Sequence, residues 1–253
     1  MGFHVIIPAR YHSTRLAAKA LALIGEQPMI VHVCQQALKS GAQSITVATD
    51  HDEIIEQVER AGFNAVLTRD DHQSGSDRVY EAAQLAGLAE QDIIVNVQGD
   101  EPFIPAENIQ QVASLLTKTS HSMATLCCPI SSAADVLDAN IVKVVFDQNL
   151  KALYFSRAPI PFCRDNPLKV SAALPTSYYR HIGIYAYRKS FLQKFIGWSP
   201  SSLELTESLE QLRAMENGAS IAIHVLSDMP PAGVDTLEDL QKAQAFYLKQ
   251  QNI

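Results

Sequence analysis

The sequence lacks any long apolar run, and no stretch approaches the ~18 residues that a membrane-spanning helix needs. Its 253 residues are 47% hydrophobic and 19% charged, a composition typical of a folded globular protein rather than a disordered one. The first ten residues, MGFHVIIPAR, have neither the charged start nor the long apolar centre of a signal peptide. We therefore expect a cytoplasmic protein with no membrane partner.

Cysteine is scarce and is not arranged for metal binding. The four cysteines are Cys34, Cys127, Cys128 and Cys163, and no pair has the Cys-x-x-Cys spacing. This excludes a cysteine-based zinc site and argues against a disulfide framework. We expect free thiols in a reducing compartment.

An excess of positive charge is also missing. Lysine and arginine number 20 against 27 aspartates and glutamates, a formal net charge of −7. This balance argues against nucleic acid as a partner but leaves room for a small anionic ligand, which a few local cations can hold. No Gly-x-Gly-x-x-Gly or phosphate-loop lysine motif is present, so a nicotinamide-dependent dehydrogenase is disfavoured.

Apolar runs and helical periodicity alternate through the first half of the chain. The pattern predicts strands at 3–7, 44–49, 65–67 and 93–97, with helices at 28–40, after Asp50 to Gly62, and from Ser74 or Ser76 to Leu85. Such alternation indicates right-handed βαβ units, and hence a doubly wound, mostly parallel α/β sheet. No repeat or linker interrupts the sequence, so we expect one domain over 1–253.

The second half alternates less regularly. Residues 142–147, 152–156 and 181–187 resemble strands with little helix between them. This predicts an antiparallel addition, inserted into the parallel sheet or laid across it. A helix at about 203–217, a strand at 220–225 and a last helix from near Thr236 complete the prediction.

The first candidate site is the segment Pro8–Lys19, directly after the first strand. It carries Arg10, Arg15 and Lys19, with Ser13 and Thr14 between them. Ligands of doubly wound sheets bind beyond the carboxyl ends of the strands, and cations with hydroxyls there can cradle a triphosphate. A solvated basic loop is the alternative.

Two carboxylates are candidate metal ligands. Asp100 follows a buried strand and Gly99, with Glu101 as the second choice, and Asp235 lies just before a capping box formed by Thr236 and Asp239. Each is as compatible with a turn or a helix cap as with metal binding.

Polar residues in other segments are candidates for lining a ligand pocket. A Ser74-Gly75-Ser76 turn opens a helix and offers free N–H groups to a base or ribose, or is a simple cap. His181 and Tyr185 share a face of one strand, because alternate residues point the same way. Arg157 and Arg180 could each pair with a substrate carboxylate through two hydrogen bonds, and an exposed polar sheet face is the alternative.

Together these segments resemble one family, the 3-deoxy-manno-octulosonate (KDO) cytidylyltransferases. The matching motifs are PARYHSTRL, ATD, DHQSGSDR, VNVQGDEP, ALYFSRAPIP, RHIGIYAYR, LEQLR and GVDTLEDL, in family order and at family spacing. The resemblance runs from Val5 to the final helix. Each motif alone is weak, and the eight in register carry the identification.

The resemblance implies a Rossmann-like nucleotidyltransferase fold and a homodimer. It implies a CTP-binding core at 1–130, an inserted sugar-binding and dimerisation region at about 131–200, and a return to the core at about 201–253. The implied reaction joins CTP and KDO into CMP-KDO and pyrophosphate, for lipopolysaccharide biosynthesis, with Mg²⁺ as the cofactor.

Residue roles also follow from the resemblance. The implied nucleotide-binding residues are Pro8, Ala9, Arg10, Ser13, Arg15, Lys19, Ser74, Gly75, Arg78 and Gln98. Those implied to bind the sugar acid are Arg157, His181, Tyr185, Glu210 and Gln211. Asp100 and Asp235 would hold Mg²⁺ and, with Arg10 and Lys19, form the catalytic group.

One departure from the family lies in the first loop. Ala17, Ala18 and Ala20 stand where the family has proline, glycine and proline. A glycine at 18 would permit a backbone conformation that alanine adopts only with strain. This loop leaves open a CTP-binding protein without turnover. A second alternative is an enzyme for another 2-keto sugar acid, such as a sialic acid or 8-amino KDO, because the motifs of the first half would look alike in such an enzyme.

Overall fold

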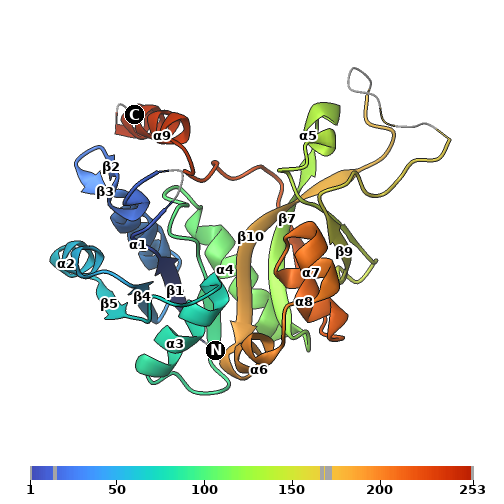
Figure 1. Ribbon diagram of the computed structural model, residues 1–253. Helices are drawn as coiled ribbons and strands as arrows, with labels where there is room; N and C mark the ends of the chain where they lie inside the picture. The colour runs from blue at the N-terminus through green and yellow to red at the C-terminus, as the bar shows by residue number, and fades with distance from the viewer. Residues whose placement is uncertain (1, 14–15, 166–167, 169–172, 252–253) are drawn as a thin grey trace.

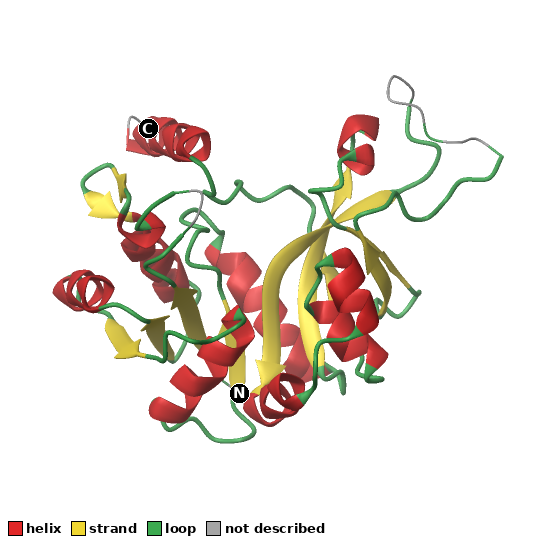
Figure 2. Cartoon of the chain, viewed as in Figure 1, coloured by secondary structure: helices red, strands yellow, loops and turns green. Residues whose placement is uncertain are grey.

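The computed structural model describes residues 2–13, 16–165, 168 and 173–251. Its main feature is a nine-stranded sheet, in which seven strands follow the order β11-β7-β10-β6-β1-β4-β5. Their bounds are β1 Phe3–Ala9, β4 Ser44–Thr49, β5 Asn64–Leu67, β6 Ile93–Asn96, β7 Met123–Ile130, β10 Tyr178–Arg188 and β11 Ile221–Val225. The sheet runs through the centre of the molecule with helices on either side (Figures 1 and 2).

The helices cover both faces because alternate strand residues point to opposite sides. One core cluster joins Val5 and Ile7 of β1 to α1, α2 and α4, and the other joins Ile6 to α3, α6 and α8. The helix bounds are α1 Met29–Lys39, α2 Asp52–Arg60, α3 Gly75–Leu85, α4 Ala106–Lys118, α5 Ala133–Leu137, α6 Lys189–Gly197, α7 Ser202–Glu207, α8 Gln211–Glu216 and α9 Leu237–Gln251. The predicted doubly wound α/β fold is confirmed.

The antiparallel addition is inserted into the sheet. β10 lies between β6 and β7 and is antiparallel to both, whereas β4, β1 and β6 pair in parallel. β8 (Lys143–Phe146) pairs with β10 and with β9 (Ala152–Ser156). Because β10 belongs to the main sheet, the proposed divisions at 130 and 200 do not separate two sheets and stay a prediction.

Three local predictions were wrong. β1 extends through Pro8 and Ala9, which is possible because its pairing with β6 ends at Ile6 and no N–H of Pro8 is needed there. His51, not Asp50, is the N-cap of α2 and accepts from the Glu53 N–H. The helix expected at 203–217 is two short helices, because Ser208 adopts a left-handed φ of 52° between them.

A small third cluster joins segments that are distant in sequence. Ile24 of β2 (Leu23–Ile24), Met29, Phe103, Val234 and two residues of α9 pack together. β2 pairs with β3 (Gln27–Pro28) and follows the 3-10 helix η1 (Lys19–Leu21). The long connection from β11 to α9 crosses the end of the sheet (Figure 1). This packing brings Lys19, Asp100 and Asp235 to one place. Within the described chain, no helix has the length and apolarity to cross a membrane.

Candidate active site

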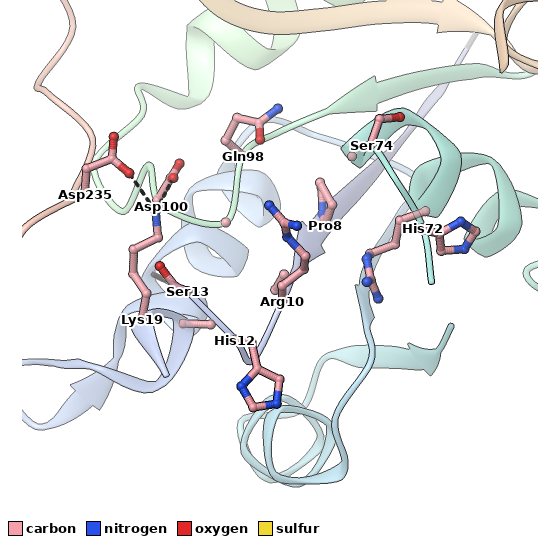
Figure 3. Close-up of a pocket in the computed structure, with 15 residues that line it drawn as sticks. Pro8, Arg10, His12, Ser13, Lys19, His72, Ser74, Gln98, Asp100 and Asp235 are labelled. Carbon is pink, nitrogen blue, oxygen red and sulfur yellow. Dashed lines mark hydrogen bonds and ion pairs between the residues drawn. The ribbon is translucent and has the colours of Figure 1, made fainter. Parts of the chain in front are cut away.

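A cavity of about 340 Å³ opens at the carboxyl ends of β1 and β6 (Figure 3). It gathers every described residue that the resemblance assigned to the nucleotide or the metal. These are Pro8, Ala9, Arg10, Ser13, Lys19, Ser74, Gly75, Arg78, Gln98, Asp100 and Asp235. Arg15 lies outside the described residues. The first loop, the turn before α3 and the segment after β6 thus form one pocket, as the strand-end rule predicts.

Lys19 and two carboxylates meet at one side of this pocket (Figure 3). The Lys19 Nζ donates to Asp100 Oδ2 at 2.6 Å and to Asp235 Oδ1 at 2.9 Å. Burial opposes the charge of the ammonium, but the two hydrogen-bonded carboxylates outweigh this effect and raise the pKa of Lys19. A Cβ at Gly99 would lie 2.9 Å from the Pro8 carbonyl oxygen, so this close approach of the two segments requires glycine.

The carboxylates of Asp100 and Asp235 suit a Mg²⁺ ion that is also bound by the phosphates of a nucleotide. Among the described residues, no group of three or more His, Cys, Asp or Glu side chains could hold a metal ion. Asp100 and Asp235 nevertheless converge on a single cation, the Lys19 ammonium. Mg²⁺ is commonly bound by one or two carboxylates together with substrate phosphates, so the donor set suits a nucleotide-bound ion.

Glu101, the second choice as a metal ligand, has a different environment. Burial, and then the negative charge of Asp100, raise the pKa of Glu101 to about 7. A carboxyl group that is partly protonated near neutral pH is a weaker metal ligand. The surroundings therefore favour Asp100 and Asp235, rather than Glu101, as the metal ligands.

The turn before α3 is both a helix cap and a pocket wall. Ser74 is the N-cap and forms a capping box with Asp77. Gly75 begins the helix, and Ser74, Gly75 and Arg78 all line the cavity. Arg78 is 1% exposed, and its Nη1 donates to Thr68 Oγ1 at 2.6 Å while its Nη2 donates to Asp50 Oδ2 at 2.9 Å.

Three residues of the lining, His12, Ala20 and His72, have no binding role predicted from the sequence. Gly99, which the sequence places beside Asp100, lines the cavity too. His72 lies within the DHQSG segment, and its Nε2 is hydrogen-bonded to Glu81 of α3. His12 lies within the first loop. Both segments are predicted binding segments, one for its cations and the other for its turn. The motifs therefore indicate the two segments, but nothing in the sequence distinguishes these histidines as lining residues.

The residues implied to bind the sugar acid lie outside the described lining of this cavity. The His181 and Tyr185 rings are 5.4 Å apart, on the shared face that was predicted. Ile182 of β10 pairs with Leu126 of β7, and the next pair is Tyr185 with Thr125, so β10 contains a bulge of two extra residues. Because the number of extra residues is even, His181 and Tyr185 stay on the same face of the sheet. His181 Nε2 lies 3.0 Å from Thr125 Oγ1, and burial lowers the pKa of His181 to about 3.

Glu210 is hydrogen-bonded to α3, the helix that begins at the pocket wall, and Gln211 follows it in the chain. Ser76 of α3 donates to Glu210 Oε2 at 2.9 Å, and burial raises the pKa of Glu210. Gln211 is 3% exposed, and its Nε2 is buried with no hydrogen-bond partner among the described residues. Buried polar atoms are usually paired, so this amide suits a polar ligand.

Arg157 is held by main-chain carbonyl groups. Its Nε donates to Glu207 O at 2.7 Å and its Nη1 to Ala139 O at 2.9 Å, and Nη2 lies 3.4 Å from Ser208 O. These contacts anchor the chain ahead of Glu210. Binding of a carboxylate by Arg157 stays a prediction.

Comparison with known proteins agrees with the site. The family model described as Cytidylyltransferase matches residues 4–221. The chain belongs to the cytidylyltransferase family. The 3-deoxy-manno-octulosonate cytidylyltransferase of Yersinia enterocolitica serotype O:8 is 50% identical over 248 residues, covering 98% of this chain and 99% of the relative. The protein of that name from Yersinia pseudotuberculosis serotype O:1b is 49% identical over 250 residues, covering 99% and 100%.

Solved structures support the same relationship. This cytidylyltransferase superimposes on CMP:2-keto-3-deoxy-manno-octonic acid synthetase complexed with CTP with a TM-score of 0.90, at 39% identity and over 100% of both chains. A putative glucose-1-phosphate thymidylyltransferase from Bacillus anthracis gives a TM-score of 0.65 at 17% identity, covering 97% of this chain and 95% of the other, which is a likeness of fold alone.

The expected strain at residue 18 of this cytidylyltransferase is present. Ala18 has φ 47° and ψ 39°, the left-handed region, immediately before Lys19. We expect Ala18→Gly to raise the melting temperature by about 2 °C, because relief of the ~1–2 kcal/mol strain exceeds the added freedom of the unfolded chain. Ala17, whose φ is not positive, provides the control: Ala17→Gly should lower the melting temperature. Equal shifts for both variants, measured by thermal unfolding, would contradict the assignment.

Proposed function

We propose that this cytidylyltransferase transfers CMP from CTP to the anomeric hydroxyl of KDO and releases pyrophosphate. The observation that carries the proposal is the meeting of Lys19, Asp100 and Asp235 in a pocket that Arg10 also lines. Cations and a carboxylate pair at one edge of a sheet are the parts that bind a nucleoside triphosphate with its metal. The names of the full-length relatives support cytidine as the base and KDO as the acceptor.

The chain contributes mainly position and charge to the reaction. Arg10 and Lys19 bind the phosphates and neutralise the charge that builds on the leaving pyrophosphate. Ser74, Gly75, Arg78 and Gln98 surround the base and ribose, with Pro8 and Ala9 at the end of β1. Asp100 and Asp235 would hold Mg²⁺, which supplies Lewis-acid stabilisation of the phosphates and lowers the pKa of the attacking hydroxyl.

The sugar acid would lie beside β10, against His181, Tyr185, Glu210, Gln211 and Arg157. Because its pKa is lowered, His181 is neutral near pH 7 and offers a hydrogen bond without charge. We further propose that the enzyme works as a homodimer in the cytoplasm, in lipopolysaccharide biosynthesis. The exposed Leu153 of β9 and Phe162 in the connection after it would suit contacts in that dimer.

Substitution of His181 tests the sugar side. We expect His181→Gln to raise the KM for KDO about 10-fold, the size of one hydrogen bond to a buried polar partner, with the KM for CTP within about two-fold of wild type. Steady-state kinetics with each substrate varied in turn measures both constants. His121→Gln, in the loop before β7, is the matched control. A rise confined to the KM for CTP would move His181 to the nucleotide side.

The function itself is tested by pyrophosphate release with CTP, Mg²⁺ and a panel of 2-keto sugar acids. KDO should be preferred over a sialic acid and over 8-amino KDO. If the enzyme prefers either competitor to KDO, that sugar acid is the substrate instead of KDO. The assignment of CTP to the nucleotide pocket would be unaffected.

A further inference from the structure

Asp50 connects two walls of the nucleotide pocket. It follows β4 directly and lies outside the described lining of the cavity. Its Oδ1 accepts from the main-chain N–H of Tyr11, in the first loop, at 3.0 Å. Its Oδ2 accepts from Arg78 Nη2, on α3, at 2.9 Å. Figure 3 shows the first loop, with Arg10 and His12, beside the segment that carries His72 and Ser74.

The contact with Arg78 is a buried ion pair. The Arg78 side chain is 1% exposed and that of Asp50 is 11% exposed. Removing one partner of such a pair leaves an uncompensated buried charge, which is strongly unfavourable. Asp50 therefore compensates a cation that the fold has withdrawn from water.

A second partner fixes the orientation of the guanidinium group. Thr68 Oγ1 accepts from Arg78 Nη1 at 2.6 Å and donates to the Thr49 carbonyl at 3.0 Å. Asp50 and Thr68 together engage two of the five N–H groups that a guanidinium carries. Since Arg78 also lines the cavity, these contacts fix the position of a side chain that borders the pocket.

The contact with Tyr11 fixes the first loop. Tyr11 lies between Arg10 and His12, which both line the cavity. Its ring stacks on His51, with centroids 3.6 Å apart and an interplanar angle of 13°. The hydrogen bond from the Tyr11 main-chain N–H to the Asp50 carboxylate and this stacking hold the loop against the end of β4.

From these contacts we propose that Asp50 is a positioning residue for CTP binding, which sets the first loop and Arg78 at the spacing that the nucleotide needs. The proposal rests on the proposed function, since it assigns CTP to this pocket. A carboxylate is required because both of its oxygens accept. Tyr11 and Arg78 donate to different oxygens of this carboxylate. An asparagine in the same position would place its NH2 group, which only donates, against one of the two donors.

Asp50→Asn tests the proposal with almost no change in shape. We expect the dissociation constant for CTP, measured by calorimetry, and the KM for CTP to rise roughly 10-fold or more, the size of one charged hydrogen bond. The KM for KDO should stay within about two-fold of wild type. Asp52→Asn, an exposed aspartate two residues away, is the matched control and should leave every constant unchanged.

Two further measurements separate positioning from a general loss of structure. Hydrogen exchange should show the Tyr11 amide protected in the wild type and faster in Asp50→Asn, with protection of β1 and β6 retained. In an Arg78→Met background, Asp50→Asn should add less to the CTP dissociation constant than it does in wild type, because the two residues act together. Circular dichroism confirms that each variant is folded.

Other results would overturn the proposal. A dissociation constant for CTP within about two-fold of wild type in Asp50→Asn would do so. Equal rises in the KM for CTP and the KM for KDO, together with faster hydrogen exchange throughout the sheet, would also do so. Hydrogen exchange and CTP binding do not depend on turnover. A wild-type protein that binds CTP but forms no CMP-KDO would therefore refute the proposed function without affecting this test.

Discussion

Asp100→Asn and Asp235→Asn should each lower kcat by about 10³-fold or more, because each removes one of the two charged oxygen ligands available to Mg²⁺ in the pocket. The structure places both carboxylates within hydrogen-bond distance of one ammonium group, so they converge on a common point of positive charge. Asparagine keeps the shape of the side chain and loses its negative charge. Pyrophosphate release at saturating CTP and Mg²⁺ measures the effect.

A direct measure of metal binding accompanies this prediction. Binding of Mn²⁺ in the presence of CTP, followed by electron paramagnetic resonance, should weaken in both variants. Asp228→Asn provides the control, since Asp228 is exposed in the connection between β11 and α9 that also carries Asp235. Near-normal turnover in either active-site variant would refute the carboxylate-pair assignment, whichever metal is supplied.

Lys19→Met should lower kcat by about 10²–10³-fold, because it removes a cation aimed at the charge that develops during phosphoryl transfer. Methionine preserves much of the length and apolar stem of the side chain. The same substitution should tighten the binding of Mn²⁺ in the absence of nucleotide. Lys19 Nζ lies between Asp100 and Asp235, at 2.6 and 2.9 Å, and therefore competes with a metal ion for these oxygens.

The opposite directions of these two effects make the test selective. A general loss of structure would weaken both turnover and metal binding. Lys242→Met, on the exposed face of α9, is the control and should change neither property. Unaltered kcat in Lys19→Met would contradict the catalytic role, and unaltered Mn²⁺ affinity without nucleotide would contradict the competition.

Several parts of the fold could be predicted because local sequence determines them. The apolar runs at β1, β4 and β6 and the periodic residues of α1 are sufficient to predict a doubly wound sheet. The rule that ligands bind at the carboxyl ends of strands then placed Arg10, Lys19 and Asp100 together. The strain at Ala18 followed from a missing glycine and is present as a left-handed backbone.

Other parts depend on contacts between distant segments. The place of β10 between β6 and β7 is set by packing, and nothing in its own pattern identifies its neighbours. The break at Ser208 lies in a helix-like sequence and is held by Arg157, which is distant in the chain. The local sequence at Asp50 predicts a helix cap, but His51 occupies that position. The contacts of Asp50 with Tyr11 and Arg78 require the tertiary fold.

Product formation from CTP and KDO tests the central claim most directly. The purified protein, supplied with CTP, KDO and Mg²⁺, should release pyrophosphate and form CMP-KDO in equal amounts, and chelation of Mg²⁺ should stop both. ATP, GTP and UTP should serve poorly in place of CTP. Tight binding of CTP without formation of CMP-KDO or pyrophosphate, under conditions where a related enzyme turns over, would contradict the account.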